Sequence, residues 1–198
     1  MRKVALIALC LLVMGSTAFA MDLVIGAGGL YGFSFEEYDY RETEDYYALH
    51  EDVKATGYGG YIFFGLSRFM EASISVELKN NAGVQTWYED GIKKTEENES
   101  PSTHVGVSVY GKYPFPVSDN VVLFPTIGVD LQNNYGGLDI WLRGGVGVDI
   151  FLGKRVFLRG QAIYGIGAML VYKGYLNEDK TAGPANGPLF KLGIGWMY

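Results

Sequence analysis

The chain has 198 residues, of which 48% are hydrophobic, 15% aromatic and 19% charged, and it contains 28 glycines and one cysteine. This length allows one ordinary domain or two small ones, and the apolar content is too high for a disordered chain. The net charge of −6 excludes the basic face that nucleic-acid binding needs, so we expect no nucleic acid among the partners. A single cysteine excludes a disulfide framework and a cysteine-rich metal site.

The first twenty residues have the three regions of a secretory signal peptide. Arg2 and Lys3 precede an apolar stretch, 4–14, which is followed by small residues and the sequence Ala18-Phe19-Ala20. The apolar stretch is shorter than the roughly 20 residues that a membrane-spanning helix needs. We therefore predict that residues 1–20 are cleaved off and that residues 21–198 form the mature domain.

Apolar and polar residues alternate along much of the remaining chain, most clearly in 140–152. One parity there is almost entirely aliphatic, whereas the other combines charged residues with glycines. Only a β-strand sends alternate residues to opposite faces in this way. The stretch 156–170 repeats the pattern, and the short turn at Gly153-Lys154 makes the two strands an antiparallel hairpin.

The same two-residue period predicts six further strands, which gives eight in total. They lie in 22–33, 55–66, 70–78, 104–115, 121–132 and 190–198. The pattern is less regular in the first two, where Tyr61 and Phe63 fall on the face opposite to Tyr58 and Ile62. We expect an all-β, antiparallel, up-and-down fold.

The polar face of these strands combines Gly, Ser and Thr with isolated charges in mid-strand. Four charges are acidic and four are basic: Glu71, Glu77, Asp130, Asp149, Lys112, Arg143, Arg159 and Lys191. A soluble surface carries denser Lys and Glu, whereas the narrow interior of a closed barrel suits small residues and paired ions. The apolar face suits lipid, in which a sheet must close because its edges cannot be hydrated. We predict a transmembrane β-barrel in which Arg143 and Arg159 pair with Asp130, Asp149 or another inward carboxylate.

The connectors between the predicted strands alternate in length. Short ones lie at 67–69, 114–120 and 153–154, and long polar ones at 34–54, 79–103 and 173–187. Barrels of the bacterial outer membrane place short turns in the periplasm and long loops outside the cell. We therefore expect an outer-membrane protein with both termini in the periplasm.

Two of the long connectors are candidate surfaces for an extracellular ligand. Loop 34–54 has eight acidic residues interleaved with tyrosines, a pattern that either keeps the loop solvated or suits a cationic partner. It lacks the spaced acidic motif of a calcium loop. In loop 79–103, Asp90-Gly91 between β-prone runs predicts a tight hairpin, so the third and fourth strands should continue beyond the membrane as a ribbon.

The end of the chain is its most specific feature, because apolar residues alternate up to a final aromatic residue. These residues are Phe190, Leu192, Ile194, Trp196 and Tyr198. With this ending and the run 142–149, the chain resembles small eight-stranded outer-membrane β-barrels of the OmpA, OmpX and OmpW kind over residues 22–198. The resemblance implies that the final residues are an assembly signal read by the barrel assembly machinery, and that outer-membrane lipid surrounds the barrel.

Signals for catalysis and cofactor binding are weak. Gly26 to Gly29 follow an apolar stretch, but Tyr31 stands where a dinucleotide-binding turn needs its last glycine. His104 and Ser108 share the inward face with nearby glutamates, so a base and a nucleophile could meet there. No motif supports such a site, and we expect no catalytic, cofactor-binding or metal-binding residues.

Two classes of function remain open. The first is a narrow channel for small or apolar solutes, since the OmpW-like resemblance implies a partly open lumen with a lateral exit. We do not expect a wide aqueous pore, because side chains fill the interior of an eight-stranded barrel. The second is a non-transporting surface protein, whose loops 34–54 and 79–103 bind a host or envelope partner.

Overall fold

The computed structural model describes residues 23–40, 49–89, 92–134, 137–171 and 180–198. The predicted signal peptide, 1–20, lies outside these residues, and so does 41–48 in the acidic connector. Within the described ranges, no helix is both long and apolar enough to cross a membrane.

Nine β-strands account for most of the described residues. They are β1 (Val24–Tyr40), β2 (Leu49–Ser67), β3 (Met70–Glu89), β4 (Ile92–Lys112), β5 (Phe115–Ser118), β6 (Val121–Asn134), β7 (Gly137–Phe151), β8 (Val156–Val171) and β9 (Lys180–Met197). A tilted strand crosses a membrane in about 9–11 residues. β4 has 21 residues and β3 has 20, so both extend well beyond that length.

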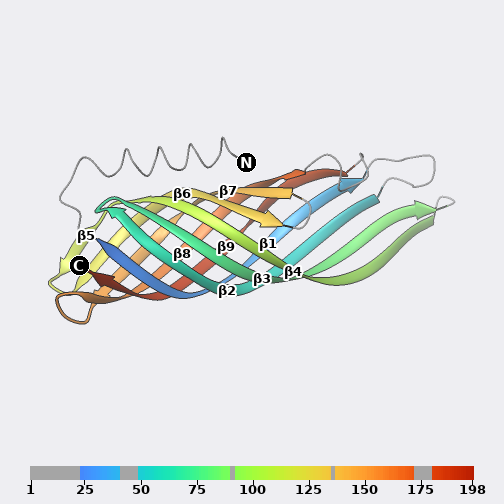
Figure 1. The fold of residues 1–198 in the computed structure, drawn as a ribbon. Coiled ribbons are helices and arrows are strands. Elements are labelled where there is room, and N and C mark those ends of the chain that lie inside the picture. The colour runs from blue at the N-terminus through green and yellow to red at the C-terminus, as the bar shows by residue number, and fades with distance from the viewer. Residues whose placement is uncertain (1–22, 41–48, 90–91, 135–136, 172–179) are drawn as a thin grey trace.

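Eight of the described strands close into one antiparallel ring (Figure 1). β1 pairs with both β2 and β9, and β4 pairs with β6 from Val105 to Lys112. β5 is a four-residue continuation of β4 after Pro114 and pairs with β6. Pro114 lacks a backbone N–H, which suits this break in the strand. The predicted eight-stranded up-and-down barrel is confirmed.

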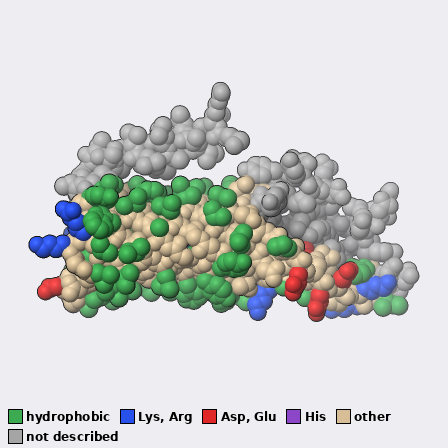
Figure 2. All heavy atoms as spheres, turned by 60° about the horizontal axis from the view of Figure 1, so that its bottom comes forward, with side chains coloured by type: hydrophobic (Ala, Val, Ile, Leu, Met, Phe, Trp, Pro, Cys, Tyr) green, Lys and Arg blue, Asp and Glu red, His purple; other side chains and the backbone are tan. Residues whose placement is uncertain are grey.

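The faces of the strands are arranged as the alternation predicted, with apolar side chains outside and charged ones inside. Figure 2 shows hydrophobic side chains distributed over the outer wall. Val146 is 63% exposed and Leu192 is 71% exposed, whereas Arg159 is 2% exposed. Such a surface is stable in hydrocarbon, because lipid chains solvate apolar side chains. The closed ring also pairs the backbone polar groups, which hydrocarbon cannot hydrogen-bond.

Aromatic residues inside the barrel explain the irregular pattern of the second predicted strand. Tyr61 and Phe63 point inward and are 3% and 0% exposed. They pack with Leu30, Phe157 and Leu189 in one buried cluster. The interior is therefore partly an apolar core, and a simple division into polar and apolar faces does not describe β2.

The two ends of the barrel differ. One end, called here the turn end, holds the short turns at 68–69, 119–120 and 152–155. The C-terminus of the chain lies beside these turns (Figure 1). Gly153 in the third turn has a φ of 144°, a backbone conformation that favours glycine. The opposite end is called the ribbon end, because β3 and β4 extend furthest there (Figure 1) and form a two-stranded ribbon beyond Thr86, where the pairing of β3 with β2 ends.

The long connectors are shorter than predicted, and the strands are longer. β1 continues to Tyr40 and β2 begins at Leu49, so most of 34–54 is strand. β9 begins at Lys180, within the connector predicted at 173–187. These boundaries were wrong because a strand in water can be polar on both faces and then shows no alternation. The ribbon predicted within 79–103 is confirmed by the pairing of Glu89 with Ile92.

Candidate functional site

Arg159 lies at the centre of an ion cluster near the turn end. Its Nε and Nη2 donate hydrogen bonds to the two carboxylate oxygens of Asp149, each at 2.7 Å, and its Nη1 contacts Glu71 Oε2. Lys112 Nζ donates to the same Glu71 oxygen at 3.1 Å. Asp149 and Arg159 are register partners on β7 and β8, whereas Glu71 comes from β3. We call these four residues the turn-end cluster.

Three aromatic rings surround the guanidinium group of Arg159. Its Cζ lies 4.5 Å from the ring centre of Phe63, 5.0 Å from that of Phe157 and 5.2 Å from that of Phe124. A planar guanidinium group stacks well on aromatic faces, and this attraction is stronger away from water. All three rings are at most 2% exposed. Arg159, Glu71 and the three rings are each at most 3% exposed, so side chains pack the interior of the barrel at this level.

A second cluster lies further toward the ribbon end. Arg143 Nε lies 2.5 Å from Asp130 Oδ2, but its N–H is not aligned for a hydrogen bond, so the contact is an ion pair. Tyr110 donates its hydroxyl proton to Asp130 Oδ1 at 2.5 Å. Lys191 Nζ lies 4.8 Å from the ring centre of Tyr110 and 5.2 Å from that of Tyr61. Tyr110, Asp130, Arg143 and Lys191 are each at most 5% exposed, so side chains also pack this second level of the interior.

The last of the charged residues named from the sequence, Glu77, interacts through an amide. Gln132 Nε2 donates to Glu77 Oε2 at 3.4 Å, and Lys79 Nζ donates to Gln132 Oε1 at 3.3 Å. Gln132 therefore bridges Glu77 and Lys79, which carry opposite charges. The eight charged residues named from the sequence all lie on the inward face, and their roles in function remain a proposal.

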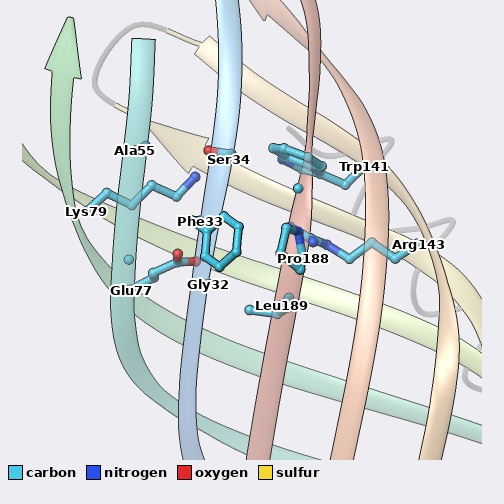
Figure 3. A pocket seen from close by; sticks show the side chains of 12 residues that line it. Gly32, Phe33, Ser34, Ala55, Glu77, Lys79, Trp141, Arg143, Pro188 and Leu189 are labelled. Carbon is cyan, nitrogen blue, oxygen red and sulfur yellow. The ribbon is translucent and has the colours of Figure 1, made fainter.

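A small cavity lies between these contacts and the ribbon end. Figure 3 shows Lys79 and Glu77 on one side of it and Trp141 and Arg143 on the other. Its water-accessible volume of about 10 Å³ holds roughly one water molecule. Trp141 Nε1 has no hydrogen-bond partner among the described residues, which fits a water in this space. The cavity is too small for an organic substrate.

The barrel wall next to this cavity has an interrupted hydrogen-bond ladder. Between β1 and β9, Gly32 pairs with Leu189 and Phe35 with Asn186, but no described pair joins 33–34 to 187–188. Pro188 lacks the N–H that a regular ladder would use. Residues on both sides of the interruption line the cavity. The register is the same on both sides of the interruption, and Gly187 packs closely against the backbone of Phe33 and Ser34.

The inward histidine does not meet the serine that the sequence placed near it. Ser108 Oγ bonds instead to Ser73 Oγ at 2.6 Å. His104 Nε2 lies 3.0 Å from Ser102 Oγ, which also accepts a hydrogen bond from Asn81 Nδ2. The other ring nitrogen, Nδ1, lies 3.7 Å from an oxygen of Asp139, too far for a hydrogen bond. The small cavity described above is not lined by His104, Ser102 or Ser108.

Three residues that complete the interior were left out of the charge network predicted from the sequence. Lys79 and Gln132 link to Glu77, and Phe124 packs on Arg159. All three continue the inward parity of their strands, so strand parity was the signal that could have found them. Phe124 was missed because an aromatic residue on a polar face carries no charge to draw attention.

The five residues of the predicted assembly signal lie on the outer face of β9 and at its end. Phe190, Leu192, Ile194, Trp196 and Tyr198 are all exposed to the membrane side. The rings of Trp196 and Tyr198 lie 6.3 Å apart. Their role in assembly remains a prediction.

Comparison with known proteins identifies the fold. No protein-family model matches the chain, and no curated protein matches its sequence. Among solved structures, the outer membrane protein OprG from Pseudomonas aeruginosa is 10% identical with a TM-score of 0.56, over 90% of this chain and 96% of OprG. The outer membrane protease OmpT from Escherichia coli is 10% identical with a TM-score of 0.48, over 91% of this chain and 98% of its own. The N-terminal β-barrel domain of Pseudomonas aeruginosa OprF is 11% identical with a TM-score of 0.38, over 86% of this chain and 99% of its own.

These identities are low, so the comparison establishes the fold alone. The alignment with OprG covers nearly the whole of both chains. The chain therefore has the fold of an outer-membrane β-barrel, as its resemblance to the small eight-stranded barrels implied.

Proposed function

We propose that this outer-membrane-type β-barrel acts at the cell surface through its ribbon end and does not conduct solutes along its axis. In this proposal the turn end and both chain termini face the periplasm, because bacterial barrels keep their short turns there. Outer-membrane lipid surrounds the apolar wall. The observation that carries the proposal is the closure of the lumen by the turn-end cluster.

Opening the lumen at the level of Arg159 would require separating buried charges. The guanidinium group would lose its two hydrogen bonds to Asp149 and its contact with Glu71. Removing one partner from a buried ion pair typically costs about 3–5 kcal/mol. A conformation with an open axis would therefore be rare, which supports a function that needs no axial pore.

The ribbon supports a function outside the membrane. Every side chain from Ile92 to Pro101 in β4 is exposed. The candidate ligand surfaces named from the sequence, 34–54 and 79–103, lie at this end, mostly as strand. Hydrogen-bonded strands present such residues at lower conformational cost than a flexible loop of the same length.

Planar-bilayer recording of the refolded full-length protein tests the proposal. We expect no discrete conductance steps. Insertion is verified in the same preparation by protection of the barrel from added protease. Regular single-channel openings of the inserted protein would contradict the proposal, because they require a continuous aqueous path through the lumen.

A second candidate function is lateral passage of small apolar solutes, which the interrupted ladder between β1 and β9 favours. A disulfide between Phe33→Cys and Pro188→Cys would close this interruption. We expect it to reduce the uptake of the apolar fluorophore N-phenylnaphthylamine by cells that express the protein. The matched control is Tyr31→Cys with Phe190→Cys, which joins a regular register pair of the same strands. Equal uptake in the two oxidised variants would exclude this route.

A further inference from the structure

The outer half of β4 is hydrogen-bonded to a neighbouring strand on one side only. β4 pairs with β3 along its whole length, but with β6 only from Val105 to Lys112. Among the described strands, none pairs with the other edge of 92–104. Pro101 lies in this segment, and proline is tolerated in a strand mainly where its missing N–H faces no partner. This edge is about 40 Å long at the rise of an extended strand.

An open strand edge is a site for adding another strand. Its backbone N–H and C=O groups can extend the sheet with a second chain, and the side chains decide which chain fits. The side chains at the tip of this edge are Lys93, Lys94, Thr95, Glu96 and Glu97, and all are exposed. The partner should therefore be a strand that presents charges complementary to this series.

The series is complementary to itself when read in the opposite direction. In an antiparallel pair centred on Thr95, Lys93 lies opposite Glu97 and Lys94 lies opposite Glu96. Symmetry repeats both pairs, which gives four contacts between opposite charges. Thr95 then lies opposite Thr95, and Thr–Thr pairs are also favourable across antiparallel strands. Residues directly opposite each other share one face of the sheet, so each of these pairs is in contact.

Other alignments of two copies are less favourable. Moving the centre to Glu96 places this glutamate opposite itself, and moving it to Lys94 does the same for the lysine. A parallel in-register pair places every charge opposite an identical charge. Like charges directly opposite each other destabilise a sheet. The sequence therefore selects the antiparallel alignment centred on Thr95.

We propose that the partner of this edge is a second copy of the chain, joined through residues 92–98 of β4 in an antiparallel, two-fold symmetric pair. The ribbon extends away from the barrel along its length (Figure 1). Antiparallel pairing of two such ribbons places the barrels at opposite ends of the joint sheet. The two copies then belong to two apposed membranes, because copies within one membrane would bring their ribbons together in the parallel direction. This inference rests on the proposed orientation, with the ribbon outside the cell.

Clustering of proteoliposomes tests the inference. Vesicles carrying the full-length protein should cluster, as measured by light scattering. K93E with K94E makes the tip wholly acidic, and E96K with E97K makes it wholly basic. We expect each double variant alone to reduce clustering at least tenfold, and a mixture of the two vesicle populations to restore it. These positions are exposed, so folding should be unaffected, and protease protection of the barrel verifies it.

The alignment is tested by cysteine crosslinking. Thr95→Cys should form a disulfide between copies on different vesicles, whereas Ser100→Cys, further along the same exposed strand, should not. Absence of clustering by the unaltered protein would overturn the inference, and so would clustering that ignores the charge reversals. A Thr95→Cys disulfide confined to copies within one membrane would overturn the antiparallel arrangement. If the inserted protein shows no channel conductance and the vesicles do not cluster, the proposed surface function stands. A second copy of the chain is then excluded as the partner.

Discussion

Replacing Arg159 with methionine is the most direct test of the closed interior. Methionine is unbranched and apolar and reaches about as far as the Arg159 Nε, so it fills part of the space between the three rings but removes the guanidinium group and its positive charge. Asp149 then loses both of its hydrogen bonds to Arg159, and Glu71 retains Lys112. The cluster changes from two positive and two negative groups to one positive and two negative groups in a space that is almost inaccessible to water.

The expected cost follows from this uncompensated charge. Breaking a buried ion pair by removing one partner typically costs about 3–5 kcal/mol. Adding Asp149→Leu to Arg159→Met leaves Glu71 with Lys112 and restores neutrality. Replacing both members of a buried pair by apolar residues is often close to neutral. We therefore expect the double variant to be more stable than the Arg159→Met variant by about 2 kcal/mol or more.

Equilibrium unfolding in urea, in lipid vesicles, measures these differences through the mobility change that accompanies unfolding of a barrel on a gel. The unaltered protein, both single variants and the double variant form a double-mutant cycle. The reasoning is refuted if Arg159→Met costs less than about 1 kcal/mol, the range of an exposed pair. It is also refuted if the effects of the two single variants simply add.

Three other perturbations test separate parts of the structure. Val146→Lys places a charge on the lipid-facing wall and should destabilise the inserted barrel by about 2–4 kcal/mol, measured by the same unfolding assay; Ala162→Lys, at its register partner on β8, should behave alike. Arg143→Ala leaves Asp130 without its ion pair and should lower the thermal unfolding temperature in detergent; an unchanged melting profile would show that this contact is dispensable. Deletion of Tyr198 should slow insertion in cells, measured as the fraction of protease-resistant barrel; normal insertion would remove this residue from the assembly signal.

Strand parity accounts for what could be predicted. In 140–152 and 190–198, hydrocarbon outside and a polar lumen inside impose opposite demands on alternate residues, so the sequence reveals both faces. β2 is the exception within the membrane, because Tyr61 and Phe63 are apolar and yet belong to the interior. Parity also placed the eight charged residues inward. Parity does not determine which of these charged residues contact each other across the lumen.

The contact between Arg159 and Glu71 illustrates this limit. The two residues are 88 positions apart, and their strands are not neighbours in the ring. Their meeting depends on how far each strand is staggered relative to the next, which no local pattern specifies. At the ribbon end, prediction from the sequence is limited for a different reason. Polar residues occupy both faces of the strands there, so neither parity stands out, and strand boundaries such as those within 34–54 could not be found.

The bond between β8 and β3 in the turn-end cluster also bears on how the protein enters a bilayer. Glu71 and Arg159 approach each other only when the sheet has curled into a cylinder. A flat intermediate would expose both ions, with Asp149 and Lys112, to the hydrocarbon, at a cost of several kcal/mol for each. We therefore expect the sheet to curl as it enters the membrane, with the Arg159–Glu71 contact formed only once the barrel is closed.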